Sequence, residues 1–150
     1  MNVPMELSRV LILDSSPEQF ITLAEKGGTR SFAIKIGTNE AVAIDRRLRG
    51  ELPARPQTHE LVDNVLRALG ATVRKIVIHR LDEGTYFASL VLEQGGELVE
   101  VDARPSDAIA LGVGAGTPIE EAEEVLEASA DERKQVEPPT EAGEDDEDDE

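Results

Sequence analysis

The chain has 150 residues and a formal net charge of −17, with 39% hydrophobic residues, only 3% aromatic residues and no cysteine. This length allows one domain with a core, which must be built from aliphatic side chains. The lack of cysteine excludes disulfides, thiolate metal sites and a cysteine nucleophile. No apolar run approaches the roughly 18 residues of a membrane span, and residues 1–9 lack a signal-peptide pattern. We therefore expect a cytoplasmic protein without membrane partners.

The negative charge is concentrated near the C-terminus. Residues 119–150 hold 16 acidic and two basic residues, so the preceding residues carry a net charge of only −3. The body shows neither a salt-adapted acidic shell nor the basic footprint of a typical nucleic-acid binder. We expect a domain over residues 1–130 and a disordered acidic tail over residues 131–150, because the tail cannot bury enough apolar surface to fold. The tail would be either a solubilising end or a nucleic-acid mimic that covers a site.

The N-terminal part of the chain predicts three short strands followed by a helix. The strands cover residues 9–13, 19–23 and 31–36. The helix would be capped by Thr38 and would end at Gly50. Its predicted buried stripe contains Ala41, Ile44 and Leu48.

A proline-rich connector over residues 52–56 leads into a second helix, which we expect Thr58 to cap and Gly70 to end. The apolar stripe of this helix is expected to be buried; it consists of Leu61, Val62, Val65, Leu66 and Leu69.

The rest of the chain predicts three strands, a short helix and a charged helical segment. The strands cover residues 72–81, 85–92 and 97–103, and the two helical segments cover residues 106–113 and 120–130. This order predicts the α+β class, with mixed or antiparallel sheets, two central helices and a short third helix after the last core strand.

Groups able to do chemistry cluster where the helices are expected to begin. Three carboxylates lie in first turns, a fourth ends a strand, and two arginines each precede a proline; they are Glu40, Glu60, Asp107, Asp102, Arg55 and Arg104. If the helix starts converge, the carboxylates could hold a divalent metal and the arginines could clamp a phosphate. The same residues also have a structural interpretation, because acids favour helix starts and arginines pair with them.

Four further side chains have two interpretations each. His59 could act as a general base or metal ligand, or it could be a partly buried side chain bonded to backbone. Thr58 and Ser106 lack the context of a nucleophile, so capping is the simpler explanation for both. Tyr86 could stack on a base, although filling the core is the commoner role of such a residue.

Four segments carry a family resemblance: GTNEA from Gly37, RPQTHEL from Arg55, GTYFA from Gly84 and DARPSDAIAL from Asp102. In this order they resemble the bifunctional nuclease domain family over about residues 8–128. The resemblance implies an α+β domain, often dimeric, with nuclease activity on DNA and RNA. The sequence departs from the family after Thr117, because Glu120–Glu121–Ala122 stands where relatives continue with an apolar, strand-like segment. We therefore expect an edge strand or a dimer contact to be lost there.

The resulting hypothesis is hydrolysis of phosphodiester bonds in DNA or RNA by a homodimer. His59, Glu60 and Asp107 are the candidate catalytic residues, with His59 activating water. The substrate would contact Arg55, Thr58, Arg104 and Ser106. The predicted ligands of Mg²⁺ or Mn²⁺ are Glu40, Asp102 and Asp107.

The alternative is a non-catalytic ligand- or protein-binding regulatory module. It predicts that Arg104 bonds Asp102 or Asp107 in a closed network without an open cleft.

Overall fold

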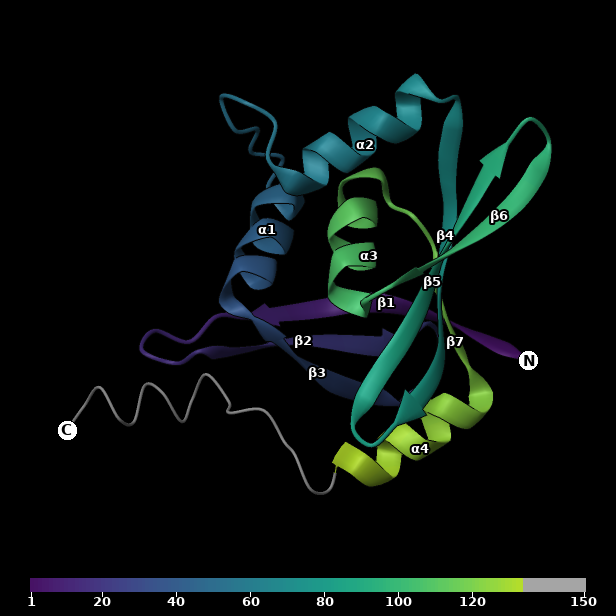
Figure 1. The fold of residues 1–150 in the computed structure, drawn as a ribbon. Helices are drawn as coiled ribbons and strands as arrows, with labels where there is room; N and C mark the ends of the chain where they lie inside the picture. The colour runs from purple at the N-terminus through teal and green to yellow at the C-terminus, as the bar shows by residue number, and fades with distance from the viewer. Residues whose placement is uncertain (134–150) are drawn as a thin grey trace.

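The structure is a computed structural model that describes residues 1–133 of the chain (Figure 1). The elements in chain order are β1 (Asn2–Leu11), β2 (Glu18–Glu25), β3 (Ser31–Gly37), α1 (Thr38–Leu48), α2 (Thr58–Ala68), β4 (Ala71–Asp82), β5 (Thr85–Gln94), β6 (Glu97–Ala103), α3 (Pro105–Gly112), the 3₁₀ helix η1 (Val113–Ala115), β7 (Ile119–Ala122) and α4 (Glu123–Arg133). The α+β class is confirmed.

The described residues form one seven-stranded mixed sheet in the order β3-β2-β1-β7-β4-β5-β6. All neighbouring strands are antiparallel except β4 and β7, which are parallel. In Figure 1 the strands β1–β3 run roughly across the direction of β4–β6, and α1, α2 and α3 lie in the angle between the two halves. The helix α4 lies at the far end, where it packs on β3, β4 and β7.

The central helix is α3, which we expected to be a short addition beside two central helices. Seven of its residues are buried, from Pro105 to Gly112 with Asp107 as the exception. Its sequence is apolar around most of its circumference, and such a helix is stable only when it is surrounded by other elements. In accordance with the composition, the core around α3 is mainly aliphatic, and Phe32 is its largest fully buried side chain.

The prediction of a buried stripe on α2 is wrong. No residue of α2 is buried, and Leu61, Val65 and Leu69 are 57%, 47% and 63% exposed. Only Val62 and Leu66 pack against the core. The reason is that α2 lies at the edge of the helical layer and contacts α3 and β4 along one side only.

The helix starts are shifted by one residue from the predicted caps. The N-caps of α1 and α2 are Gly37 and Gln57, so Thr38 and Thr58 are helical residues. The cap of α3 is Arg104, with a proline next to it and Ser106 inside the first turn. The expected ends are confirmed, because Gly50 and Gly70 have positive φ values of 70° and 74° directly after the two helices.

The expected loss of a strand at Glu120–Glu121–Ala122 is wrong. These residues belong to β7, which pairs with β1 on one side and with β4 on the other. Alternation along the strand puts Ile119 and Glu121 on the core face and Glu120 on the outer face, where it accepts a bond from Lys75 at 3.2 Å. The backbone hydrogen bonds to both neighbours outweigh the cost of placing a carboxyl group inside.

The predicted helix over residues 120–130 is displaced toward the C-terminus for the same reason. The segment begins as β7, and α4 starts at Glu123 and continues to Arg133. The rest of the predicted tail, residues 134–150, lies outside the described residues. Among the helices of residues 1–133, none is long and apolar enough to span a bilayer.

Glu121 is fully buried, with 0% of its surface exposed. Its Oε2 lies 3.4 Å from the hydroxyl of Ser129, and its Oε1 has no hydrogen-bond partner among the described residues. Burial raises the pKa of Glu121 to about 8, against the smaller opposing effects of the Ser129 hydroxyl and the charge of Arg30; Glu123 adds a small increase. The folded protein therefore keeps a proton that the unfolded chain releases above a pH of about 4.5.

We expect this proton to make stability fall as the pH rises from about 5 to about 8. In this interval the unfolded chain binds fewer protons than the folded one, so Glu121 lowers the free energy of unfolding by up to about 1.4 kcal/mol per pH unit. Replacing Glu121 with Gln should flatten the profile and stabilise the protein most above pH 8. Urea unfolding followed by circular dichroism at several pH values measures both effects. Glu120→Gln is the control, and its free energy of unfolding should change with pH as steeply as that of the wild type. If Glu121→Gln also showed the wild-type slope, Glu121 would not be the group that holds the proton.

Candidate functional site

Three helix starts converge in the structure, as the sequence hypothesis required. The carboxylate of Asp107 on α3 lies 3.0 Å from Nε2 of His59 on α2. Its second oxygen accepts a bond from Nε of Arg104 at 2.8 Å, and Nη2 of Arg104 donates to Glu40 on α1 at 3.0 Å. A continuous polar chain, which we call the helix-start network, therefore runs from His59 through Asp107 and Arg104 to Glu40.

Local sequence features hold the ends of this network in place. Pro105 occupies the first position of α3, where its missing N–H costs no hydrogen bond and its fixed φ favours a helix. Gly37 caps α1, and a Cβ atom at this position would lie only 2.3 Å from Oε1 of Glu40. Glycine therefore leaves room for the Glu40 side chain to fold back over the start of its own helix.

One guanidinium, that of Arg104, pairs with two carboxylates in this network. Partial burial of Asp107 acts to raise its pKa, but the bonds from Arg104 and His59 outweigh burial and hold the pKa below its usual value. The bond to Asp107, aided by Glu40, raises the pKa of Arg104. Because an ionised carboxylate can only accept, Nε2 of His59 must be the protonated nitrogen that donates to Asp107. This tautomer leaves Nδ1 as the free acceptor.

A second arginine fixes the three helices relative to one another. Arg47 of α1 donates through Nε to the carbonyl of Ala110 and through Nη2 to the carbonyl of Leu111, near the C-terminal end of α3. Its other bonds reach α2, at 2.9 Å to Glu60 and 2.6 Å to Asp63. One largely buried guanidinium thus joins α1, α2 and α3.

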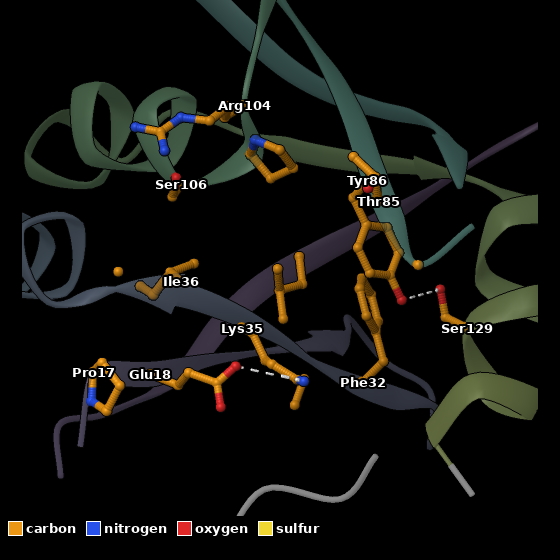
Figure 2. Close-up of a pocket in the computed structure, with 15 residues that line it drawn as sticks. Pro17, Glu18, Phe32, Lys35, Ile36, Thr85, Tyr86, Arg104, Ser106 and Ser129 are labelled. Atoms are coloured by element: carbon orange, nitrogen blue, oxygen red, sulfur yellow. Dashed lines mark hydrogen bonds and ion pairs between the residues drawn. The ribbon is translucent and has the colours of Figure 1, made fainter. Parts of the chain in front are cut away.

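A cavity of about 580 Å³ opens beside the helix-start network. Figure 2 shows Arg104 and Ser106 at one end of it and Tyr86 and Ser129 at the other. Residues of β3 line the side between them, with Phe32 next to Tyr86 and with Lys35 in an ion pair with Glu18. The cavity therefore combines an apolar wall and one ion pair with polar groups at both ends.

Ser106 is only 5% exposed, yet its side chain makes no hydrogen bond to any residue that the structure describes. At the other end, the hydroxyl of Tyr86 donates to Oγ of Ser129 at 3.0 Å. Ser129 in turn donates to the carbonyl of Val125 at 2.7 Å. At the Arg104 end, therefore, a nearly buried hydroxyl is left without a partner among the described residues.

The remaining predicted site residues lie apart from this centre. Arg55 is exposed in the connector before α2 and makes no hydrogen bond or ion pair with residues 1–133. It also does not line the cavity that Arg104 lines. Thr58 is exposed in the first turn of α2.

Glu60 turns toward Arg47 and accepts a bond from the backbone N–H of Gln57 at 3.0 Å. Burial acts to raise the pKa of Glu60, but these bonds lower it below its usual value.

The three predicted metal ligands do not meet at one point. Glu40 and Asp107 are both occupied by Arg104, which lies between them. Asp102 alternates along β6 with Val101 and Ala103, whose partners Leu90 and Ala88 belong to the core, so Asp102 lies on the opposite face. Within the described part of the chain, no group of three or more His, Cys, Asp or Glu side chains is arranged to hold a metal ion. The predicted Mg²⁺ or Mn²⁺ site does not fit this arrangement.

Sequence reasoning missed Arg47 and the Tyr86–Ser129 pair. Arg47 had a signal: it follows Ile44 by three residues, so it lies on the buried side of α1 where Leu48 was expected. Leu48 is instead exposed. The Tyr86–Ser129 pair had no signal, because 43 residues separate its members.

The sheet, the central α3 and the helix-start network define an α+β fold with a polar site where helices begin. The chain belongs to the bifunctional nuclease domain family, whose model matches residues 21–134. It is also 39% identical over 106 residues to two proteins of Mycobacterium tuberculosis strains, both named as uncharacterized. The match covers 71% of this chain and 63% of each relative, so the chain spans less than two thirds of their length.

We expect Arg47→Met to lower the free energy of unfolding by about 3 kcal/mol. The change leaves Glu60, Asp63 and two carbonyls of α3 without their shared donor, and breaking a buried pair on one side typically costs that much. Urea unfolding measures the loss. Arg49→Met, at an exposed pair on the same helix, is the control and should change stability by less than about 1 kcal/mol. Equal effects of the two variants would contradict the role of Arg47.

Proposed function

We propose that this protein hydrolyses phosphodiester bonds in DNA or RNA, with the helix-start network as its centre. Membership of the bifunctional nuclease domain family supports a nucleic-acid substrate. The observation that carries the proposal is the chain His59–Asp107–Arg104, in which a histidine oriented by a carboxylate stands next to an exposed guanidinium.

In the proposed mechanism His59 is the general base. Asp107 holds Nε2–H, so Nδ1 takes a proton from the attacking water. Water attacks the phosphorus, the bond to one ester oxygen breaks, and the departing oxygen takes up a proton from solvent. The carboxylate also stabilises the imidazolium that forms, as in other oriented histidine bases.

Arg104 would bind the scissile phosphate. Its side chain is 63% exposed, and its Nη1 donates to none of the described residues. The guanidinium can therefore donate to a phosphate oxygen while it keeps its hydrogen bonds to Asp107 and Glu40. Arg55, exposed and without a partner in residues 1–133, would supply a second positive charge along the substrate. The pairing of Glu60 with Arg47 supports a positioning role for Glu60.

The rival function is a non-catalytic binding module, and one observation favours it. Arg104 bonds Asp107, one of the two carboxylates that this hypothesis named, and it also bonds Glu40. The hypothesis also predicted the absence of a cleft, whereas Arg104 lines a cavity of about 580 Å³. A binding module would show no turnover in carefully purified protein.

We expect Asp107→Asn and His59→Gln each to lower cleavage of single-stranded DNA and RNA by about 100-fold. This is the usual contribution of a general base, and the asparagine variant no longer stabilises its imidazolium. Initial rates on fluorescently labelled oligonucleotides measure the loss, with Mg²⁺, with Mn²⁺ and with EDTA. The EDTA arm tests the metal dependence that was expected from the sequence; the steps proposed above use no metal, so cleavage should persist in EDTA.

The control is Asp45→Asn, on the same helix as Glu40 but in an exposed pair with Arg49. It should cleave at the wild-type rate, and circular dichroism should show that all variants are folded. Undiminished cleavage by Asp107→Asn would overturn the assignment, because it would point to a contaminating nuclease.

We also propose that the protein is a homodimer that pairs through α2 and the edge of the sheet. The exposed stripe of Leu61, Val65 and the C-cap residue Leu69 on α2 is apolar, and β6 ends the sheet with exposed Val99 and Val101, which share one face of the strand. Contact with a second copy would remove both apolar surfaces from water, which is the usual reason for such a patch.

Val65→Asp should therefore raise the dimer dissociation constant at least about tenfold, because it would bury an unpaired charge. Analytical ultracentrifugation measures the change. Asn64→Asp adds the same charge at the neighbouring exposed position of α2 and serves as the control. A wild-type chain that is monomeric at high micromolar concentration would contradict this proposal.

A further inference from the structure

The cavity beside Arg104 has the composition of a ligand site. Its volume of about 580 Å³ lies inside the range of about 300–1,000 Å³ that is typical of small-molecule sites. Phe32, Ile34 and Ile36 of β3 supply apolar walls, and the charges of Glu18 and Lys35 on the same side pair with each other at 3.6 Å. Further polar groups lie at the two ends. A ligand that fits this layout has one anionic end and one flat, apolar end.

The Arg104 end is suited to a phosphate. Nη1 of Arg104 has no partner among the described residues, and the nearly buried hydroxyl of Ser106 on the adjacent turn likewise has none. Both residues line the cavity (Figure 2). A guanidinium and a hydroxyl that both have unused donors leave room for an anionic oxygen to accept from each.

The opposite end is suited to a base. Tyr86 lines the cavity, and its ring is fixed on one side by Phe32, with ring centroids 5.2 Å apart, and at its hydroxyl by Ser129. A ring that is already held in place loses little freedom when a flat ligand stacks on it. Because the Tyr86 hydroxyl already donates to Ser129, recognition at this end would depend on stacking and would tolerate different bases.

We propose that this cavity is a nucleotide subsite, in which Arg104 and Ser106 hold a phosphate and Tyr86 stacks on the attached base. The inference rests on the proposed nuclease function for the choice of a nucleotide as the ligand. A base can enter the cavity only when it is unpaired, so the substrate at this position is a single-stranded segment or a flipped nucleotide.

The chain provides its own probe for the subsite. It contains one tyrosine and no tryptophan, so intrinsic fluorescence excited in the tyrosine band reports on Tyr86 alone. Uridine 5′-monophosphate and adenosine 5′-monophosphate should both quench this fluorescence after correction for their absorption. Ribose 5-phosphate, which has the sugar and phosphate but no base, should bind at least about tenfold more weakly, because stacking supplies roughly that factor.

Calorimetric titration of the full chain with uridine 5′-monophosphate tests the named residues. Tyr86→Leu should weaken binding about tenfold and Ser106→Ala about threefold to tenfold. The matched control is Phe87→Leu, which removes the neighbouring ring on the other side of β5, where it contacts Arg80. It should bind as tightly as the wild type. Ser106→Ala removes only a hydroxyl, so it keeps the test valid if Tyr86→Leu fails to fold.

Two results would overturn the inference: equal affinity for uridine 5′-monophosphate and ribose 5-phosphate, or unchanged nucleotide affinity in both Tyr86→Leu and Ser106→Ala. The outcome is separable from that of the proposed function. Cleavage that depends on Asp107 in a chain that binds no mononucleotide would overturn the subsite and leave the nuclease standing. Nucleotide binding that depends on Tyr86 in a chain that cleaves nothing would support the subsite and overturn the nuclease.

Discussion

The arrangement of the helices depends on the guanidinium of Arg47. Helix α2 has no buried residue of its own, so hydrophobic burial alone does not determine its position. Arg47 supplies the missing constraint, because one planar group with fixed donor directions bonds Glu60 and Asp63 on α2 and two carbonyls of α3. Those carbonyls lie near the C-terminal end of α3, where helices carry partial negative charge and favour a cation.

The position of α2 in turn determines whether the site exists. His59 and Glu60 are adjacent in the first turn of α2 but point to different partners: Glu60 to Arg47 and His59 to Asp107. The contact that anchors the helix and the contact that orients the histidine are therefore neighbours in sequence. At the N-cap of α3, Arg104 has a similar double role, because it pairs with two carboxylates and still presents free donors beside a cavity. Structural pairing and phosphate binding are compatible uses of the same guanidinium.

Two errors of prediction had the same physical origin. Glu120 and Glu121 are polar in sequence, but β7 lies between β1 and β4 and carries Glu121 into the core. The stripe of α2 is apolar in sequence, but no element of the described chain covers Leu61, Val65 and Leu69. In both cases side-chain polarity predicted exposure wrongly because burial depends on what packs above and beside an element. The candidate residues of the helix starts were predictable by type and position, whereas the cavity joining Arg104 to Tyr86 was not.

The sequence by itself determined the type and order of most elements, the glycine-terminated ends of α1 and α2, an aliphatic core and membership of a nuclease family. These features follow from local backbone preferences, from side-chain periodicity and from motifs that are continuous in the chain. Only the tertiary structure decided that α3 is central, that Glu121 is buried, that Arg47 joins three helices and that His59 meets Asp107. Those outcomes depend on contacts between residues up to 118 positions apart, and such contacts leave no periodic signal in a single sequence.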